Sequence, residues 1–233
     1  MSAPYFYEPL ITNHSNTYTL SEDTSKHCVQ VLRMQEGDPL EITNGMGEIF
    51  EAVITLAHKK NTTVNITAHK TQSPLEQKIV LGISLLKNAV RLEWLFEKAT
   101  EMGIHTIVPL ICERTIHERF KMDRMQNILQ SAMIQSKQVW LPNLPAPTAL
   151  KSFIEQHKAK QQFIAHCEPG HKESIKAIEP GSDCIVLIGP EGDFTPSEIE
   201  LAIKNNYQAI HLGNTRLRTE TAGIFALSVL KKF

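Results

Sequence analysis

No stretch of this sequence approaches the ~20 consecutive apolar residues that a membrane-spanning helix requires. The N-terminus also has no basic segment followed by an apolar one, so we expect neither a secretion signal nor a membrane partner. The cysteines are scattered and include no C-x-x-C pair, a pattern that favours reduced, mostly buried thiols in a cytoplasmic protein. They are Cys28, Cys112, Cys167 and Cys184.

The common phosphate-binding loops are missing as well. No G-x-G-x-x-G motif opens the α/β part of the chain, and G-x-x-x-x-G-K-[ST] occurs nowhere. The usual dinucleotide and nucleoside triphosphate sites are therefore excluded. A net charge of −1 also argues against a broad polyanion-binding surface, because proteins with such surfaces are usually strongly basic.

Residues 1–72 have the pattern of a small β-barrel domain. Residues 39–54 form two alternating runs around Asn44 and Gly45, a pair that favours a hairpin turn. Residues 62–68 alternate again, and only residues 25–32 indicate a helix. A polar, proline-containing joint at residues 71–75 separates this domain from a second one, which we expect to span residues 73–233.

In residues 73–233, strand patterns alternate with helix patterns, which predicts βαβ units and an α/β domain with a mostly parallel sheet. We expect strands at residues 79–85, 105–110, 163–165, 185–188 and 210–212. We expect helices at residues 92–102, 122–139, 149–157 and 221–232.

Two glycine-marked loops follow the last two predicted strands. Gly189 and Gly192 interrupt the chain after residue 188, and Gly213 does so after residue 212. Open parallel sheets bind ligands at the carboxyl ends of their strands, so both loops are candidates for a binding site. A capping box formed by Thr195 and Glu198 explains the start of the next helix but leaves the glycines unexplained.

Arg216 and Arg218 come just before the last predicted helix. A purely structural interpretation makes Thr219 the N-cap of that helix and assigns Glu220 to the helix dipole. That interpretation does not account for the two arginines, because cations at a helix N-terminus oppose the dipole. We therefore expect the arginines to face an anion or a polar ligand.

Metal and thiol chemistry have little support. His166, Cys167 and His171 share one loop, but no fourth ligand stands nearby, so we expect no metal site. Neither Cys167 nor Cys184 has an evident base beside it, which argues against a nucleophilic cysteine.

Residues 188–195 and 212–222 resemble the two signature loops of the RsmE family. Further blocks at residues 31–38, 93–103 and 107–114 extend the resemblance over nearly the whole chain. Members of this family are bacterial enzymes that methylate N3 of a uridine in 16S ribosomal RNA. They belong to the SPOUT class, so the resemblance implies a C-terminal α/β trefoil knot and an N-terminal PUA-like β-barrel that binds RNA.

The resemblance also implies a set of site residues. S-adenosylmethionine would be held by the loop after Ala165 and by the two glycine loops. The implied cofactor-binding residues are His166, Leu187, Ile188, Gly189, Gly192, Leu212, Gly213, Leu217, Thr219 and Ala222. Arg218 would stabilise negative charge on the uracil as N3 loses its proton, and Glu220 would take that proton, with Glu191 as an alternative.

The partners implied are 16S ribosomal RNA within the 30S subunit and a second copy of the chain, as a homodimer. Acidic residues outnumber basic ones in the N-terminal domain, so we expect RNA to be recognised at a few basic points, with a modest salt dependence. The candidate RNA-binding residues are Arg33, Arg114, Arg119 and Arg124.

The sequence departs from the family pattern at a few positions. Asp193 stands where the family usually has a second glycine, Ile134 replaces a glutamate, Lys137 replaces an arginine, and His27 lies in a barrel segment that is often more basic. Two other functions stay open. The chain could be a SPOUT methyltransferase for another RNA position, or a non-catalytic RNA-binding factor for ribosome assembly, although the intact residues 217–220 disfavour the second.

Overall fold

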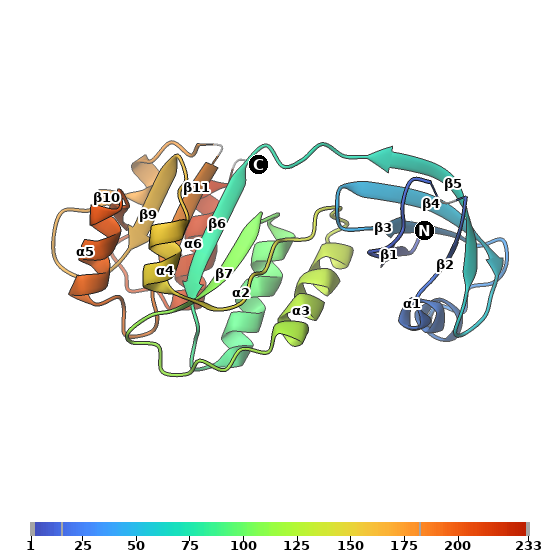
Figure 1. The fold of residues 1–233 in the computed structure, drawn as a ribbon, viewed down its shortest axis with the longest axis horizontal. Coiled ribbons are helices and arrows are strands. Elements are labelled where there is room, and N and C mark those ends of the chain that lie inside the picture. Colours follow the sequence, from blue (N-terminus) through green and yellow to red (C-terminus); the bar gives the residue numbers. More distant parts are fainter. Residues whose placement is uncertain (1–2, 15, 182, 232–233) are drawn as a thin grey trace. The chain divides into compact units, whose positions relative to one another are not determined.

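The computed structural model describes residues 3–14, 16–181 and 183–231. The chain forms two compact units, drawn as a ribbon in Figure 1. The first unit comprises the chain up to Pro74 together with Met133–Leu141, and the second comprises Leu75–Ala132 and the chain from Pro142 onward. The predicted division between residues 72 and 73 stays a prediction, and sequence patterning gave no sign that residues 133–141 group with the first unit.

The first unit is built on a five-stranded sheet in the order β1-β3-β4-β5-β2. Its pairs are antiparallel except for β1 with β3. The expected hairpin is confirmed, because β3 and β4 pair on either side of Asn44 and Gly45. The strands are β1 (Tyr5–Tyr7), β2 (Thr17–Thr19), β3 (Pro39–Thr43), β4 (Glu48–Leu56) and β5 (Thr63–Thr71).

The helical segment of this unit is irregular. Helix α1 (Glu22–Lys26) continues as one turn of π-helix, His27–Val31, and Cys28 from that turn is buried in the core with Ile42 and Phe50. Arg33 follows with a φ of 57°, in the left-handed region that non-glycine residues rarely adopt. Val31 and Leu32 beside it are exposed.

The second unit contains a seven-stranded sheet in the order β10-β12-β9-β11-β6-β7-β8, and all of its neighbouring strands are parallel. The predicted alternation of strands and helices is confirmed. The strands are β6 (Lys78–Ser84), β7 (Thr106–Ile111), β8 (Thr148–Ala149), β9 (Gln161–Ala165), β10 (Glu173–Ser174), β11 (Asp183–Ile188) and β12 (Gln208–His211).

Helices cover both faces of this sheet (Figure 1). On one face, α6 packs against β6, β11 and α2, and it also meets the short 3-10 helix Ile175–Ala177 from the loop between β9 and β11. On the other face, α4 packs against β7 and α5. The helices of this unit are α2 (Ala89–Glu101), α4 (Leu150–Gln156), α5 (Pro196–Lys204) and α6 (Thr219–Leu230), together with the part of α3 (Met122–Gln135) that precedes Met133.

Several helix ends differ from the sequence prediction, and α2 begins at Ala89 rather than at residue 92. Helix α3 ends at Gln135 rather than at residue 139, because Lys137 has a φ of 53° and cannot continue the helix. Helix α6 begins two residues earlier than expected, and the predicted end at residue 232 lies outside the described residues. None of the helices within the described residues is long and apolar enough to cross a membrane.

Candidate functional site

The two glycine-marked loops come together because their strands flank a common neighbour. Strands β11 and β12 both pair in parallel with β9, so the loops after β9, β11 and β12 leave the sheet at the same carboxyl edge. Each loop carries residues that the sequence singled out. The structure therefore supports the expected binding edge.

A cavity of about 310 Å³ lies at this edge, between the loop after β9 and the loop after β12. Apolar residues supply part of its wall, and the continuous segment from His211 to Leu217 supplies much of the rest. Six predicted cofactor-binding residues line it: His166, Ile188, Leu212, Gly213, Leu217 and Ala222.

The cavity offers polar groups that the protein leaves unused. Within the part of the chain that the structure describes, the amides of residues 213–217 donate no hydrogen bond to another backbone group. Gly213 has a φ of 127° and open space beside its Cα, a backbone form that suits glycine and leaves room for a ligand. These amides can serve as donors to a bound polar molecule.

His166 is the clearest unsatisfied group in the cavity. Both ring nitrogens are buried, and neither has a hydrogen-bond partner among the described residues. Burial lowers the pKa of His166 below its ordinary value of 6.5, and Lys172 lowers it further, against opposing effects of Asp193 and Glu168. The ring is therefore neutral at pH 7, with one donor and one acceptor to offer.

A second, charged cavity of about 280 Å³ adjoins the first, and both are bounded by Cys167, Arg216 and Leu217. Its wall carries guanidinium groups and carboxylates in equal number. These side chains are Arg91, Arg216, Arg218, Glu191, Asp193 and Glu220. A mainly apolar cavity thus lies beside a cavity lined by charged side chains.

Arg218 and Glu220 line this charged cavity because α6 begins at its wall. The N-cap is Arg218 rather than Thr219, and its side chain makes no capping hydrogen bond. Glu220 is buried, and its Oε1 lies 3.7 Å from Nε of Arg91. Arg91, from the first turn of α2, was not among the predicted residues, since nothing in its local sequence indicates that it faces Glu220.

Some predicted cofactor residues line neither of these two cavities. Leu187 is buried in the core between the sheet and helices α4 and α5. Gly189 packs under Phe194, whose ring would lie 3.1 Å from an added Cβ. Gly192 lies against Arg114. Thr219, by contrast, lines the charged cavity.

The candidate RNA-binding arginines fall into two groups. Arg114 donates to the carbonyl oxygens of Gly192 (2.7 Å) and Phe194 (3.3 Å), and Arg124 forms a two-pronged ion pair with Glu93. That pair holds the pKa of Glu93 below its usual value. Arg33 and Arg119 are exposed and have no hydrogen bond or ion pair with a described residue.

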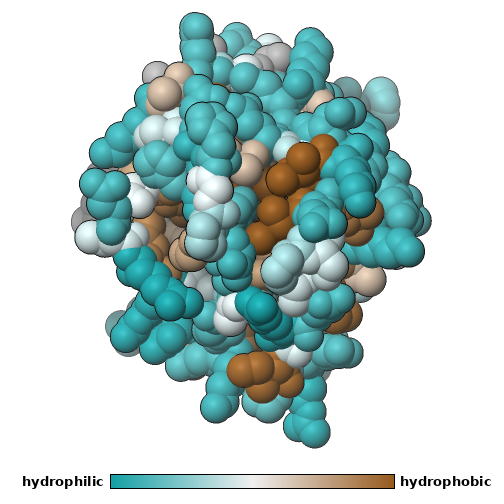
Figure 2. Space-filling view, turned by 90° about the vertical axis from the view of Figure 1, so that its left-hand side faces the viewer, coloured by the Kyte–Doolittle hydropathy of each residue, from teal (hydrophilic) through white to brown (hydrophobic). Residues whose placement is uncertain are grey.

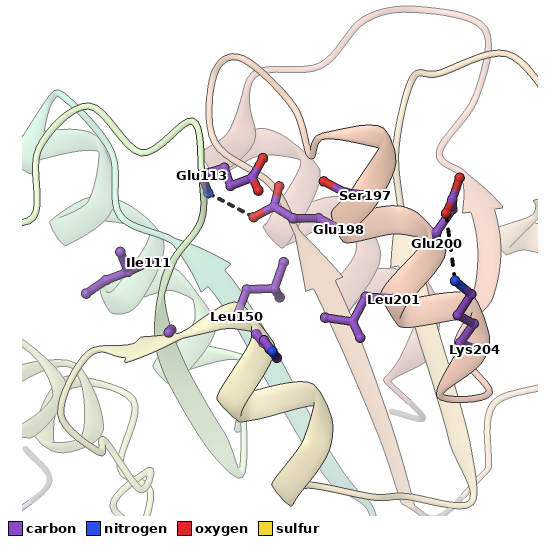
Figure 3. Close-up of a pocket in the computed structure, with 10 residues that line it drawn as sticks. Ile111, Glu113, Leu150, Ser197, Glu198, Glu200, Leu201 and Lys204 are labelled. Carbon is purple, nitrogen blue, oxygen red and sulfur yellow. Dashed lines mark hydrogen bonds and ion pairs between the residues drawn. The ribbon is translucent and has the colours of Figure 1, made fainter.

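The largest of these hollows, about 520 Å³, lies between α4 and α5 and contains none of the predicted site residues (Figure 3). Several of its polar side chains already have partners within the protein. Glu198 completes the predicted capping box with Thr195 and also accepts a hydrogen bond from the Glu113 amide (2.8 Å). Figure 2, viewed from the left of Figure 1, shows a largely polar surface with a few separate apolar areas.

Metal coordination has no support here. Across the described residues, no group of three or more His, Cys, Asp or Glu side chains is arranged to hold a metal ion.

Comparison with known families and proteins gives consistent matches. The model of an RNA methyltransferase domain matches residues 71–231, and that of an RNA methyltransferase PUA domain matches residues 20–67. The chain is 30% identical to the ribosomal RNA small subunit methyltransferase E of Synechocystis sp., over 91% of this chain and 72% of that protein. It is 25% identical to the protein of that name from Bacillus subtilis, over 92% and 89% of the two chains.

Solved structures agree over the full length. A methyltransferase from Legionella pneumophila, solved with bound S-adenosylmethionine, has a TM-score of 0.89 at 31% identity and matches 99% of this chain and 97% of its own. A ribosomal RNA small subunit methyltransferase E from Neisseria gonorrhoeae, also bound to S-adenosylmethionine, has a TM-score of 0.87 at 26% identity, over 98% and 97%. These likenesses confirm the fold class expected from the sequence.

Proposed function

The chain belongs to the RNA methyltransferase family that includes the ribosomal RNA small subunit methyltransferase E proteins, and from this premise we propose that it methylates N3 of a uridine in 16S ribosomal RNA. The methyl donor is S-adenosylmethionine. The observation that carries the proposal is the junction of a mainly apolar cavity with a charged one at Cys167, Arg216 and Leu217.

The first cavity suits S-adenosylmethionine. Ile188, Leu212 and Leu217 offer apolar surface to an adenine ring, and the free amides of residues 213–217 can donate to its polar atoms. Neutral His166 adds a donor and an acceptor. When bound, the cofactor supplies a methyl group on a sulfonium, and the protein contributes position and electrostatics.

The second cavity suits the uracil. N3 becomes a competent nucleophile only when it loses its proton, and negative charge then spreads onto the two flanking carbonyl oxygens. The guanidinium of Arg218 lines this cavity without a capping bond to its own helix, so it is available to stabilise that charge. Arg218 is the residue we assign to this role.

Glu220 is our candidate for accepting the N3 proton. Its carboxylate lines the same cavity and is held at the wall by Arg91. Glu191, the alternative, also borders the cavity, but its Oε1 accepts a hydrogen bond from the Lys87 amide at 3.1 Å. That contact gives Glu191 a structural duty, which favours Glu220.

We assign RNA binding to the N-terminal unit and to exposed basic side chains of the second. Arg33 and Arg119 are the strongest candidates, because no described residue occupies their guanidinium groups. Arg114 and Arg124 remain candidates only if RNA replaces their present partners. A substrate in the small ribosomal subunit implies that the protein works in the cytoplasm.

We also propose that the protein is a homodimer with two-fold symmetry, as the family resemblance implies. Light scattering coupled to size-exclusion chromatography measures the molar mass directly. The proposal expects twice the mass of the 26.3 kDa chain at micromolar concentration. A monomeric mass would contradict it.

The test of the proposed activity is transfer of a labelled methyl group from S-adenosylmethionine to isolated 30S subunits. Label incorporated into 16S ribosomal RNA supports the proposal. Calorimetric binding of S-adenosylmethionine without transfer would favour a different RNA substrate. Absence of both binding and transfer would favour a non-catalytic assembly factor.

A further inference from the structure

The turn after β11 connects with three other loops at the carboxyl edge of the sheet. After β6, the Lys87 amide donates to Glu191. After β7, Arg114 donates to the carbonyl oxygens of Gly192 and Phe194. After β9, the Cys167 amide donates to Asp193. The turn therefore fixes its neighbours to one another as well as bordering the charged cavity.

Asp193 makes the most direct of these connections. Its Oδ2 accepts from the Cys167 amide at 2.7 Å, and its Oδ1 accepts from the Phe194 amide at 2.8 Å. Its own amide donates to the Pro190 carbonyl at 2.9 Å. Both carboxylate oxygens are thus engaged, and bonds to an ionised acceptor are stronger than neutral ones.

The backbone of Asp193 explains why this position is unusual. Its φ is 64°, in the left-handed region that glycine adopts freely and that aspartate tolerates better than most residues. A glycine here would keep the turn but lose both carboxylate bonds. Aspartate keeps the turn and adds a link to the loop after β9.

That loop borders both cavities. Cys167 lines each of them, and His166, its neighbour, has the unpartnered ring in the first. Apart from Asp193, the loop is held by Lys172, whose Nζ donates to the carbonyl oxygens of His166 (3.2 Å) and Glu168. Lys172 belongs to the loop itself, so only the Asp193 bond ties residues 166–168 to the turn after β11 among the hydrogen bonds of the described residues.

We propose that Asp193 is a positioning residue, which holds the loop after β9 in the conformation that receives S-adenosylmethionine. The inference rests on the proposed function for the identity of the ligand. The turn after β11 would then affect cofactor binding through the loop after β9. It would fix the positions of His166 and Cys167 before the cofactor binds. Preorganisation of this kind raises affinity by removing the cost of ordering a loop on binding.

Two substitutions separate the carboxylate from the backbone. Asp193→Gly allows the left-handed turn and removes both acceptors. Asp193→Asn also tolerates the turn but retains one acceptor oxygen and loses the charge. Glu200→Gln is the matched control, because it removes an equal charge from an exposed side chain of α5.

The first readout is hydrogen exchange of the segment containing Cys167 in the free protein. We expect exchange to be roughly tenfold faster or more in Asp193→Gly, intermediate in Asp193→Asn and unchanged in Glu200→Gln. The second is the dissociation constant of S-adenosylmethionine by calorimetry, which should rise roughly tenfold in Asp193→Gly. Wild-type exchange, or faster exchange with unchanged affinity, would overturn the proposal.

Thiol labelling tests the contact between Asp193 and Cys167 without the cofactor, so its result does not depend on the proposed function. Burial raises the pKa of Cys167, and Asp193 raises it further, whereas the other three cysteines are buried away from reagent. Both Asp193 variants should therefore label faster than wild type at pH 8, since more thiolate is present. Unchanged labelling would refute the contact, whereas failure of wild-type protein to bind S-adenosylmethionine would count against the proposed function instead.

Discussion

Arg218 combines two duties at one position. Its backbone caps α6, which places the positive end of the helix dipole beside its own guanidinium. The side chain shares the charged cavity with Arg91 and Arg216. This concentration of positive charge opposes the helix dipole, but it also creates a site where negative charge on a bound base is strongly stabilised.

Replacing Arg218 should therefore affect turnover more than cofactor binding. We expect Arg218→Ala to lower kcat by about 10²-fold or more, with nearly unchanged affinity for S-adenosylmethionine. Arg218→Lys keeps the positive charge but lacks the planar guanidinium, so its kcat should lie between those of the wild type and Arg218→Ala. Steady-state methylation of 30S subunits and calorimetry measure the two quantities. Near-normal turnover by Arg218→Ala, with cofactor bound, would refute the role.

His166 should make the stability of the protein depend on pH. Its native pKa is lowered, so the unfolded chain binds a proton more readily than the folded one. The contribution of His166 to the free energy of unfolding is therefore complete above about pH 6.5, the pKa of the unfolded state. It declines as the pH falls below that value. Urea denaturation at pH 7.5 and 5.5 should show a smaller decline in His166→Gln, with His117→Gln as the control for an exposed histidine. Equal declines in His166→Gln and wild type would contradict this account.

At the residue scale, the sequence indicated which side chains face a ligand better than it indicated which residues contact one another. The pattern predicted that Arg216 and Arg218 face a ligand, and both line the charged cavity. It could not reveal that Arg114 supports the turn after β11, because Arg114 and its partner Gly192 are 78 positions apart in the sequence. Arg91 was missed for the same reason.

In the large sheet, β6 leaves no room for a larger side chain at Gly82 unless its neighbours move. A Cβ on Gly82 would lie 2.7 Å from Cδ2 of Leu187 on β11 and 3.0 Å from Cδ1 of Leu110 on β7. Both contacts fall in the buried layer beneath α4 and α5. Close approach of these two side chains therefore favours glycine at this strand position, and its φ is not in the left-handed region.

Gly82→Ala should lower the free energy of unfolding by about 1–3 kcal/mol, the usual cost of overpacking a core. The entropy gained by removing a glycine, about 0.4–1 kcal/mol, offsets only part of this. Denaturant unfolding measures the difference.

Leu187→Val provides the matched test, because it removes the methyl group that the new Cβ would meet. The double variant should be more stable than the sum of the two single effects predicts. Strict additivity would show that the contact with Leu187 is not the source of the strain.

At the scale of elements, periodicity predicted the long strands and helices and missed the short ones. Strands β8 and β10 have two residues each, too few for any alternation to be seen. The end of α3 depended on a left-handed backbone at Lys137, which a lysine does not signal. By contrast, the capping box of α5 was predicted and is present, because its residues are neighbours in sequence.

At the scale of the whole molecule, the fold rests on an order of strands that periodicity does not contain. The chain forms the strands of the large sheet in numerical order, but they lie side by side in the order β10-β12-β9-β11-β6-β7-β8, and patterning alone would have given an ordinary open sheet. The SPOUT class was reached through resemblance of two loops, and the family matches confirm it. The grouping of residues 133–141 with the N-terminal unit was not foreseen, because it depends on contacts such as that between Met46 and Trp140.

The central claim is that this protein methylates N3 of a uridine in 16S ribosomal RNA, and nucleoside mass spectrometry tests it most directly. 16S ribosomal RNA from cells that lack the gene should have lost N3-methyluridine. Incubating their 30S subunits with the protein and S-adenosylmethionine should restore that nucleoside, and the Arg218→Ala variant should not. Unchanged N3-methyluridine in the deletion strain, or restoration of a different methylated nucleoside, would contradict the account.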